Sequence, residues 1–155
     1  MRYKEDGGWI GEYEIIVTHQ DGTTKKENIK NRITNAGLNM LRDGLNGGVT
    51  DLELKYLALG IGDTAINDTD TQLINEQFRT TFISTTKPGV GLLQKTALVL
   101  DGEAVFNIKE LAIFAGATAT STADTGIMVS RILYARDKTN LESIQFVRTD
   151  TIDRG

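Results

Sequence analysis

The sequence predicts a mainly β protein, a two-sheet β-sandwich with one short α-helix at about residues 35–46. Short runs of β-branched, aromatic or alternating apolar residues recur at intervals of about 8–12 residues, between turns rich in Gly, Asp and Pro. One segment alone has leucines at helical spacing. A chain of 155 residues fits one domain, and a domain of that size can bury a hydrophobic core.

The first predicted element is an antiparallel hairpin with strands at Trp9–His19 and Thr23–Lys30. Asp21-Gly22 separates the two runs, and glycine readily adopts the positive φ that tight hairpin turns require. The two strands are therefore expected to pair directly.

The helix is expected at Asn35–Asn46, with Thr34 or Asn35 as its N-cap and Gly47-Gly48 at its end. Its apolar stripe repeats at i, i+3 and i+7 and consists of Leu38, Leu41 and Leu45. Gly37 and Gly44 each weaken a helix by up to about 1 kcal/mol relative to Ala. We therefore expect the leucine stripe to stabilise the helix by packing against a sheet.

The remaining elements are predicted to be strands, at Leu52–Ala58, Phe78–Thr85, Leu92–Leu100, Ala104–Phe114, Gly126–Tyr134 and Leu141–Ile152. Lys87-Pro88-Gly89 predicts a turn, since Pro fixes φ and Gly frees the next position. No repeat or long linker divides the chain. We expect a single domain over residues 1–155, with an N-terminal hairpin or arm at 1–30, a sandwich body at 31–152 and a C-terminal arm at 148–155.

Charge and composition narrow the possible partners. A net charge of −4 argues against nucleic acid, because a nucleic-acid-binding protein needs a dense basic face. The absence of cysteine excludes disulfides and thiolate metal sites. The N-terminal residues are polar, and no run approaches the ~20 apolar residues that span a bilayer, so we expect no membrane insertion and folding in the cytoplasm.

Catalytic signatures are weak. The single histidine, His19, lies beside the predicted turn, and no G-x-S-x-G motif supplies a nucleophile for it. Gly60-Ile61-Gly62 lacks the third glycine and the following helix of a dinucleotide-binding loop. We therefore expect no enzymatic activity and no cofactor.

Three carboxylates, those of Asp63, Asp68 and Asp70, lie in one turn-rich segment and are candidate Ca²⁺ ligands. Their spacing does not match an EF-hand loop, and the alternative is that they form Asx-turns with nearby backbone N–H groups. No metal site is predicted beyond these candidates.

Four charged residues lie within otherwise apolar strand motifs: Glu76, Arg79, Glu110 and Arg131. A charge beside buried strands is costly unless it is paired. We expect Glu76 or Glu110 to pair with Arg79 or Arg131 and so to fix the long loop to the sheet. These four residues are called the clasp below.

Candidate interface residues lie at both ends of the chain. Trp9 and Tyr13 share one strand face, with Tyr3 close in sequence, and either core packing, an intersubunit contact or sugar binding explains them. The segment from Arg148 to Arg154 interleaves Arg with Asp, as expected of either a solvated edge or an arm that docks on a neighbouring subunit.

Four motifs occur in order between about residues 31 and 152: YLALGxG from Tyr56, DTxLxNExxR from Asp70, ExxIF from Glu110 and GxxxSRxLY from Gly126. Together they resemble a family of small structural proteins of tailed bacteriophages, described as tail-fibre or tail-associated proteins, and all four clasp residues occupy motif positions. The resemblance implies a non-enzymatic virion protein, assembled in the host cytoplasm, whose partners are its own copies and other virion proteins. A tail-fibre, baseplate or tail-adaptor component is expected; the alternatives are a head decoration protein and a module that binds host surface glycans.

Overall fold

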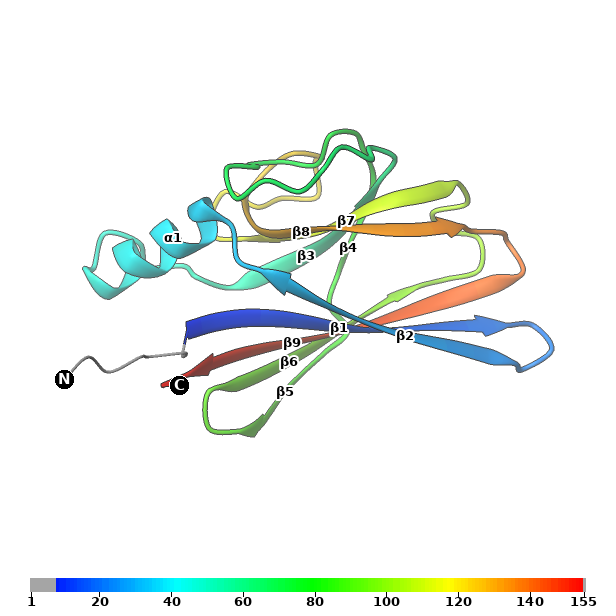
Figure 1. The fold of residues 1–155 in the computed structure, drawn as a ribbon, viewed down its shortest axis with the longest axis horizontal. Coiled ribbons are helices and arrows are strands. Elements are labelled where there is room, and N and C mark those ends of the chain that lie inside the picture. The colour runs from blue at the N-terminus through cyan, green and yellow to red at the C-terminus, as the bar shows by residue number, and fades with distance from the viewer. Residues whose placement is uncertain (1–7, 155) are drawn as a thin grey trace.

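The computed structural model describes residues 8–154, which form two antiparallel sheets packed face to face and one helix (Figure 1). The predicted two-sheet β-sandwich with one short helix is confirmed. The elements are β1 (Gly8–His19), β2 (Thr24–Arg32), α1 (Asn35–Leu45), β3 (Leu54–Gly60), β4 (Glu76–Thr81), β5 (Ser84–Gly89), β6 (Leu92–Val99), β7 (Asn107–Ala115), β8 (Ile127–Asp137) and β9 (Glu142–Asp153).

The five-stranded sheet has the order β2-β1-β9-β6-β5, and the four-stranded sheet has the order β4-β3-β7-β8. The predicted hairpin of β1 and β2 forms. It is not a separate N-terminal arm, however, because β1 also pairs with β9 along its whole length, from Gly8 opposite Asp153 to His19 opposite Glu142. The expected C-terminal arm is likewise wrong up to Asp153, since β9 is the central strand between β1 and β6.

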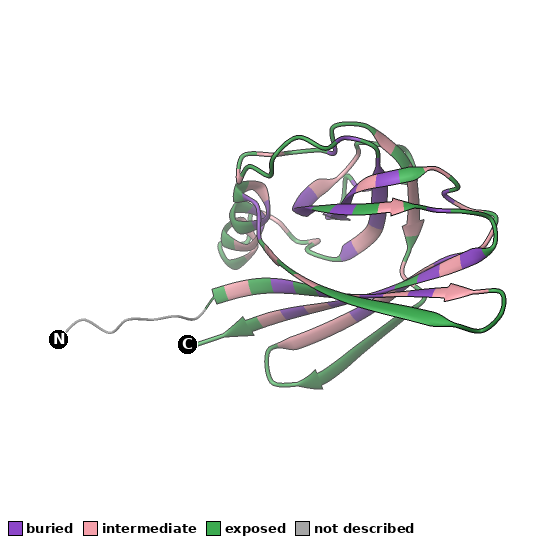
Figure 2. Cartoon of the chain, turned by 45° about the vertical axis from the view of Figure 1, so that its right-hand side comes forward, coloured by how far each residue is buried: buried purple, intermediate pink, exposed green. Residues whose placement is uncertain are grey.

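The main hydrophobic core lies between the sheets and takes side chains from both, including Tyr13, Ile15 and Phe146 from the larger sheet and Leu57 and Leu111 from the smaller. Figure 2 shows buried residues along the central strands, whereas the tip of the β1–β2 hairpin and strand β5 are exposed.

The four-stranded sheet is also buried on its outer face. Ala58, Ala112, Phe114 and Met128 form a second apolar cluster there with Leu73, which comes from the segment between β3 and β4. Residues 61–75, called the cover loop below, thus lie over this face. Burial on both faces explains why β7 is almost continuously buried instead of alternating.

The helix begins and ends close to its predicted bounds, but the predicted leucine stripe is wrong at two of its three residues, since only Leu41 is half-buried. Leu38 and Leu45 are exposed, and the buried helical residues are Gly37 and Met40. The Thr34 side chain caps the N-terminus by accepting a hydrogen bond from the Gly37 N–H, and its own hydroxyl donates to the Met128 carbonyl of β8. Because Thr34 is bonded both to the helix and to β8, the helix is oriented with Gly37 against β8. No helix in residues 8–154 has the length and apolar character needed to cross a membrane.

Alanine substitutions at the two helix glycines, Gly37 and Gly44, are expected to change the free energy of unfolding in opposite directions. A Cβ at Gly37 would lie 2.8 Å from Ile33 Cγ2 and 3.1 Å from the backbone of Val129, so Gly37→Ala is expected to lower the free energy of unfolding by about 1 kcal/mol. A Cβ at Gly44 meets only the end of the partly exposed Leu52 side chain, at 2.7 Å, so Gly44→Ala is expected to raise stability by up to about 1 kcal/mol through helix propensity. Urea denaturation of both variants measures the two changes in the free energy of unfolding. A Gly37→Ala variant more stable than the native chain would contradict the close packing of Gly37 against Ile33 and Val129.

The predicted strand Phe78–Thr85 is wrong in extent. Residues 76–81 form β4 in the smaller sheet, and Ser84 onwards form β5 in the larger, so the chain crosses between sheets at Phe82. The predicted turn at Lys87-Pro88-Gly89 is also displaced: these residues end β5, and the reversal is at Val90-Gly91, where Gly91 has φ +70°. Pro88 is tolerated because β5 is an edge strand with an irregular register at this point.

Candidate functional site

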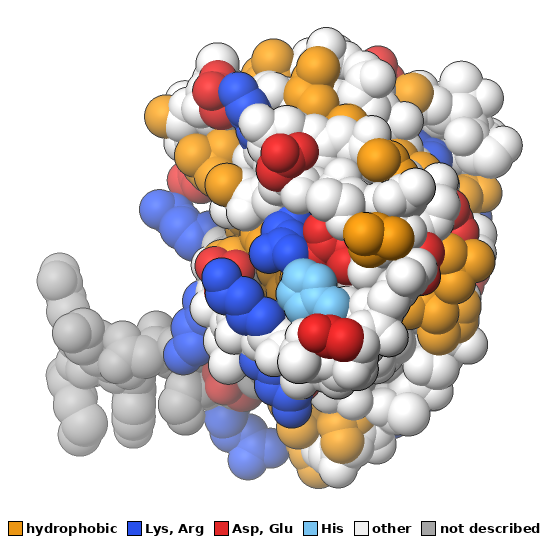
Figure 3. Space-filling view, turned by 90° about the vertical axis from the view of Figure 1, so that its right-hand side faces the viewer, with side chains coloured by type: hydrophobic (Ala, Val, Ile, Leu, Met, Phe, Trp, Pro, Cys, Tyr) orange, Lys and Arg blue, Asp and Glu red, His pale blue; other side chains and the backbone are white. Residues whose placement is uncertain are grey.

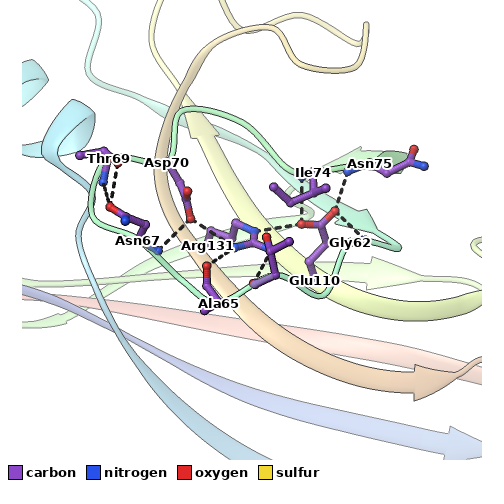
Figure 4. Close-up of polar contacts among 10 residues, drawn as sticks. Gly62, Ala65, Asn67, Thr69, Asp70, Ile74, Asn75, Glu110 and Arg131 are labelled. Atoms are coloured by element: carbon purple, nitrogen blue, oxygen red, sulfur yellow. Dashed lines mark hydrogen bonds and ion pairs between the residues drawn. The ribbon is translucent and has the colours of Figure 1, made fainter.

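Glu110 and Arg131 form a fully buried ion pair on adjacent strands β7 and β8, with Arg131 Nε 2.9 Å from Glu110 Oε2 (Figure 4). The carboxylate also accepts backbone hydrogen bonds from Gly62 at 3.0 Å, Asn75 at 2.8 Å and Ile74 at 3.1 Å. These three donors come from the two ends of the cover loop. One carboxylate therefore fixes both ends of the loop to the sheet.

Arg131 holds the middle of the cover loop. Its guanidinium donates to the Thr64 carbonyl at 3.0 Å and to Asp70 Oδ2 at 3.2 Å. The Asp70 carboxylate in turn accepts the N–H of Asn67, whose side chain accepts from Thr69 in a local turn (Figure 4). Both members of the buried pair therefore have further hydrogen-bond partners besides each other. A buried charge is tolerated under this condition.

Glycines at positions 60 and 62 make room for the Glu110 carboxylate. A Cβ at Gly60 would overlap the Asn75 carbonyl oxygen and lie 2.5 Å from Glu110 Oε1, and a Cβ at Gly62 would lie 2.9 Å from the same oxygen. The glycines of the YLALGxG motif therefore permit a close approach of side chain to backbone, which is a structural role.

Gly60→Ala is expected to lower the free energy of unfolding by about 1–3 kcal/mol, because the new methyl group meets a backbone carbonyl that is fixed by the clasp. Gly102→Ala is the matched control: a Cβ there meets nothing within 4 Å, so its effect is expected to stay within about 0.5 kcal/mol. Thermal unfolding by circular dichroism compares the two; equal melting temperatures contradict the packing argument.

The other two clasp residues form a second pair. Arg79 Nε lies 2.7 Å from Glu76 Oε2, and both side chains are almost completely buried. Arg79 also donates to the carbonyls of Thr120 and Thr125, and its guanidinium lies 4.4 Å from the centre of the Phe114 ring. This pair holds the loop that precedes β8, as the first pair holds the cover loop.

The structure thus joins the clasp residues as Glu76–Arg79, within one motif, and Glu110–Arg131, whose hydrogen bonds bring together residues of all four motifs. Each carboxylate is engaged by backbone N–H groups or an arginine, so the arrangement fixes loops and offers no free acid or base.

The candidate metal ligands do not converge. Asp63 lies 3.5 Å from Lys109, Asp68 lies 2.8 Å from Arg32, and Asp70 bonds to Arg131. Within residues 8–154 no three His, Cys, Asp or Glu side chains are grouped as a metal site would require. The hypothesis of a shared cation is therefore not supported, because each carboxylate has a different cationic partner.

A second buried polar network lies inside the sandwich, around Arg148. Its guanidinium donates to Asp150 Oδ1 at 2.8 Å, to Asn31 Oδ1 at 2.7 Å and to Ser130 Oγ at 3.1 Å. It lies 4.8 Å from the centre of the Tyr13 ring, whose hydroxyl is 2.9 Å from Ser130 Oγ. The network connects the two sheets, and burial raises the pKa of Tyr13 above its usual value near 10.

Three of the candidate interface residues are buried or partly buried: for Trp9 and Tyr13 this agrees with the core-packing alternative, whereas for Arg148 it contradicts both the solvated edge and the docking arm. Arg148 and Tyr13 are wholly buried, so they are not surface contacts; Arg148 is tolerated inside because Asp150 neutralises it. Trp9 is partly buried against the core and donates its indole N–H to Asp150 at 2.8 Å. Arg154 is exposed, and Tyr3 lies outside the described residues.

Sequence reasoning missed Gly11, although its position inside a strand pattern was a usable signal. A Cβ at Gly11 would overlap the Arg148 guanidinium, so this glycine provides the space in which the arginine lies across β1. Ser130 belongs to the GxxxSRxLY motif, but its sequence position did not indicate a role. Nothing local in the sequence indicated that Asn31 and Asp150 would contact Arg148.

His19 lies at the hairpin end of the sandwich, away from the clasp. Figure 3 views the end of the sandwich that carries the histidine and shows it among side chains of both charges. The backbone N–H of His19 bonds to Thr23 in the hairpin turn.

Fold and network together define a β-sandwich in which buried ion pairs fix long loops. Comparison with known protein families, with curated proteins and with solved structures found no match to this chain.

Proposed function

We propose that this chain is a non-enzymatic structural protein of a tailed-phage virion, which acts by assembling with copies of itself and with other virion proteins. We place it on the tail, as a fibre, baseplate or tail-adaptor component. The resemblance of the four motifs supports this proposal, and so does the structural use of their charged residues in holding loops.

The observation that carries the proposal is an apolar surface at one end of the sandwich, here called the apolar end and defined by Leu45, Leu52, Val90 and Ile152. Leu45 is 83% exposed and Val90 is 94% exposed. The other two residues, Leu52 and Ile152, line a mostly apolar cleft of about 190 Å³. Exposed apolar surface of this kind marks contact with another protein.

The parts of the apolar end lie side by side although they are distant in sequence. Leu52 contacts the helix at Gly44, next to Leu45, and Ile152 donates its backbone N–H to the Gly91 carbonyl, next to Val90. Figure 1 shows α1, the β5–β6 turn and the end of β9 at this same end. Protruding apolar side chains beside an apolar cleft fit a second copy of the same surface, as in an isologous contact.

The assembly is tested by light scattering coupled to size-exclusion chromatography. The native chain is expected to form an oligomer, and the double variant Leu45→Glu/Val90→Glu is expected to be monomeric, because two buried carboxylates would lack partners. Leu141→Glu, at an exposed leucine in the β8–β9 turn, is the matched control and should leave the oligomer intact. A monomeric native chain, or equal dissociation by the control, contradicts this use of the surface.

Location is tested separately by electron microscopy of intact phage particles with a gold-labelled antibody against the chain. Label at the tail or its tip is the expected result. Label distributed over the capsid would overturn the tail placement in favour of a head decoration protein, and absence of the chain from purified virions by mass spectrometry would overturn the virion proposal.

A further inference from the structure

A second cleft, of about 270 Å³, lies on the open side of the sandwich where the chain crosses from β4 to β5. Its lining includes Glu53, Tyr56, Phe82, Thr85 and Lys95, from both sheets and from the crossover between them. Ligand sites in proteins are concave, with apolar walls and a few polar groups, and have volumes of roughly 300–1,000 Å³. At about 270 Å³ this cleft is slightly smaller than that range, so it suits a small ligand.

Lys95 is the unusual residue of the cleft. It lies on the inner face of β6 and is only 9% exposed, yet its ammonium has one hydrogen bond, to the Leu54 carbonyl at 2.9 Å. The nearest carboxylate, that of Glu53, is 3.9 Å away and belongs to a largely exposed side chain. Since an ammonium has three donors, two of them have no acceptor among the described residues.

The other lysine that is buried within residues 8–154, Lys138, has the hydrogen bonding of a purely structural ammonium. Lys138 donates to three carbonyl oxygens, those of Leu100, Asp101 and Thr139, at 3.0–3.2 Å. All three of its donors are used. Lys95 is 9% exposed and has one such bond, with the Glu53 carboxylate 3.9 Å away, so two of its donors are available to a ligand in the cleft.

Lys95 also has a second cation as its neighbour across the sheet. In the register of β6 and β9, Lys95 lies directly opposite Arg148, and like charges in that arrangement destabilise a sheet. Asp150 neutralises Arg148, but no carboxylate within hydrogen-bonding distance neutralises Lys95. The cleft's second ammonium, that of Lys55, is already paired with Asp51 at 2.6 Å. Lys95 is therefore the more weakly compensated cation of the cleft, with the Glu53 carboxylate 3.9 Å away and the Phe82 ring as its other neighbour.

We propose that this cleft is a binding site for an acidic saccharide, whose carboxylate is held by the Lys95 ammonium. The compact charge of a lysine suits a single oxyanion. The Phe82 ring has Lys95 Nζ over its face at 5.3 Å and lines the cleft beside it, so it provides an apolar wall next to the ammonium. The hydroxyl of Thr85 provides a partner for a sugar hydroxyl. The site is distinct from the apolar end and goes beyond the proposed structural role.

The test is an NMR titration of the full chain with millimolar glucuronic acid and N-acetylneuraminic acid. At least one acid is expected to shift the amide signals of residues 53–56, 81–85 and 95. The methyl ester of each sugar keeps its shape and removes its charge, so the esters are expected to bind at least tenfold more weakly. Acetate and inorganic phosphate measure what the charge alone contributes, and both are expected to bind more weakly than the acid sugar.

Two variants that are expected to change the affinity for the acid sugar in opposite directions distinguish an effect on binding from an effect on folding. Lys95→Met removes the ammonium and keeps the stem, and affinity is expected to fall by about 10–100-fold, as for loss of a hydrogen bond to a charged group. Glu53→Gln removes the competing carboxylate, and affinity is expected to rise severalfold, which a folding defect cannot produce. Lys109→Met, at an exposed lysine of β7, is the matched control and should leave the affinity unchanged.

The proposal is overturned if neither acid sugar shifts the cleft signals, or if Lys95→Met and Lys109→Met bind alike. Phosphate or acetate binding as tightly as the sugar would also overturn it, since the saccharide ring would then contribute nothing. Selective binding of the acid sugars, lost in Lys95→Met and strengthened in Glu53→Gln, supports it.

Discussion

Glu110→Ala is expected to lower the free energy of unfolding by about 3–5 kcal/mol and the melting temperature by roughly 10 °C. The substitution leaves the Arg131 guanidinium buried without its carboxylate, and breaking one side of a buried pair costs far more than the pair itself contributes. It also removes the acceptor of three backbone N–H groups, those of Gly62, Ile74 and Asn75. Each orphaned buried donor adds a desolvation penalty.

Hydrogen exchange distinguishes the loss of the clasp from a general loss of stability. The amides of Gly62, Ile74 and Asn75 are expected to exchange faster in Glu110→Ala, relative to amides of the central strands, because the cover loop opens locally. The control is Asp63→Ala, which breaks the exposed pair with Lys109 in the same loop and is expected to cost less than about 1 kcal/mol. An unchanged melting temperature in Glu110→Ala would exclude a stabilising clasp.

Arg148→Met is expected to destabilise the chain by a similar amount, about 3–5 kcal/mol, since Asp150 would remain buried with only the Trp9 indole as a donor. Asn31 and Ser130 would lose their arginine bonds as well. Methionine preserves most of the side-chain volume, so cavity formation contributes little. Urea denaturation gives the free energy of unfolding directly.

Two further variants sharpen the test of the Arg148 network. Gly11→Ala is expected to destabilise the chain with Arg148 present, because the added methyl group displaces the guanidinium. It is expected to cost clearly less in the Arg148→Met background, a coupling that a double-mutant cycle measures. Arg154→Met changes an exposed arginine and should be neutral within about 0.5 kcal/mol. Equal effects of Arg148→Met and Arg154→Met would contradict a buried network.

Local sequence was sufficient for the fold class, the β1–β2 hairpin and the position of the helix. Each depends on neighbours in the chain: the alternation of side chains along a strand, the Asp21-Gly22 turn and the Thr34 cap. The four clasp residues were also visible, because a charge within an apolar run needs a partner whatever the topology is.

Long-range pairing decided the rest. The segment from Arg148 to Arg154 has the alternating charges of an exposed arm, yet most of it lies in the central strand of a sheet, since β9 pairs with β1 and β6. A local pattern cannot show that Gly11 leaves space for Arg148, because 136 positions separate residues that only the strand order brings together.

The leucines of the helix show the same limit. The sequence by itself determined that a helix forms between Thr34 and Gly47, but not which face it buries. The contacts of Thr34 and Gly37 with β8 set that rotation, and they bury Met40 while leaving Leu38 and Leu45 exposed. Periodicity specifies that a helix is amphipathic, whereas close packing against one particular strand specifies its orientation.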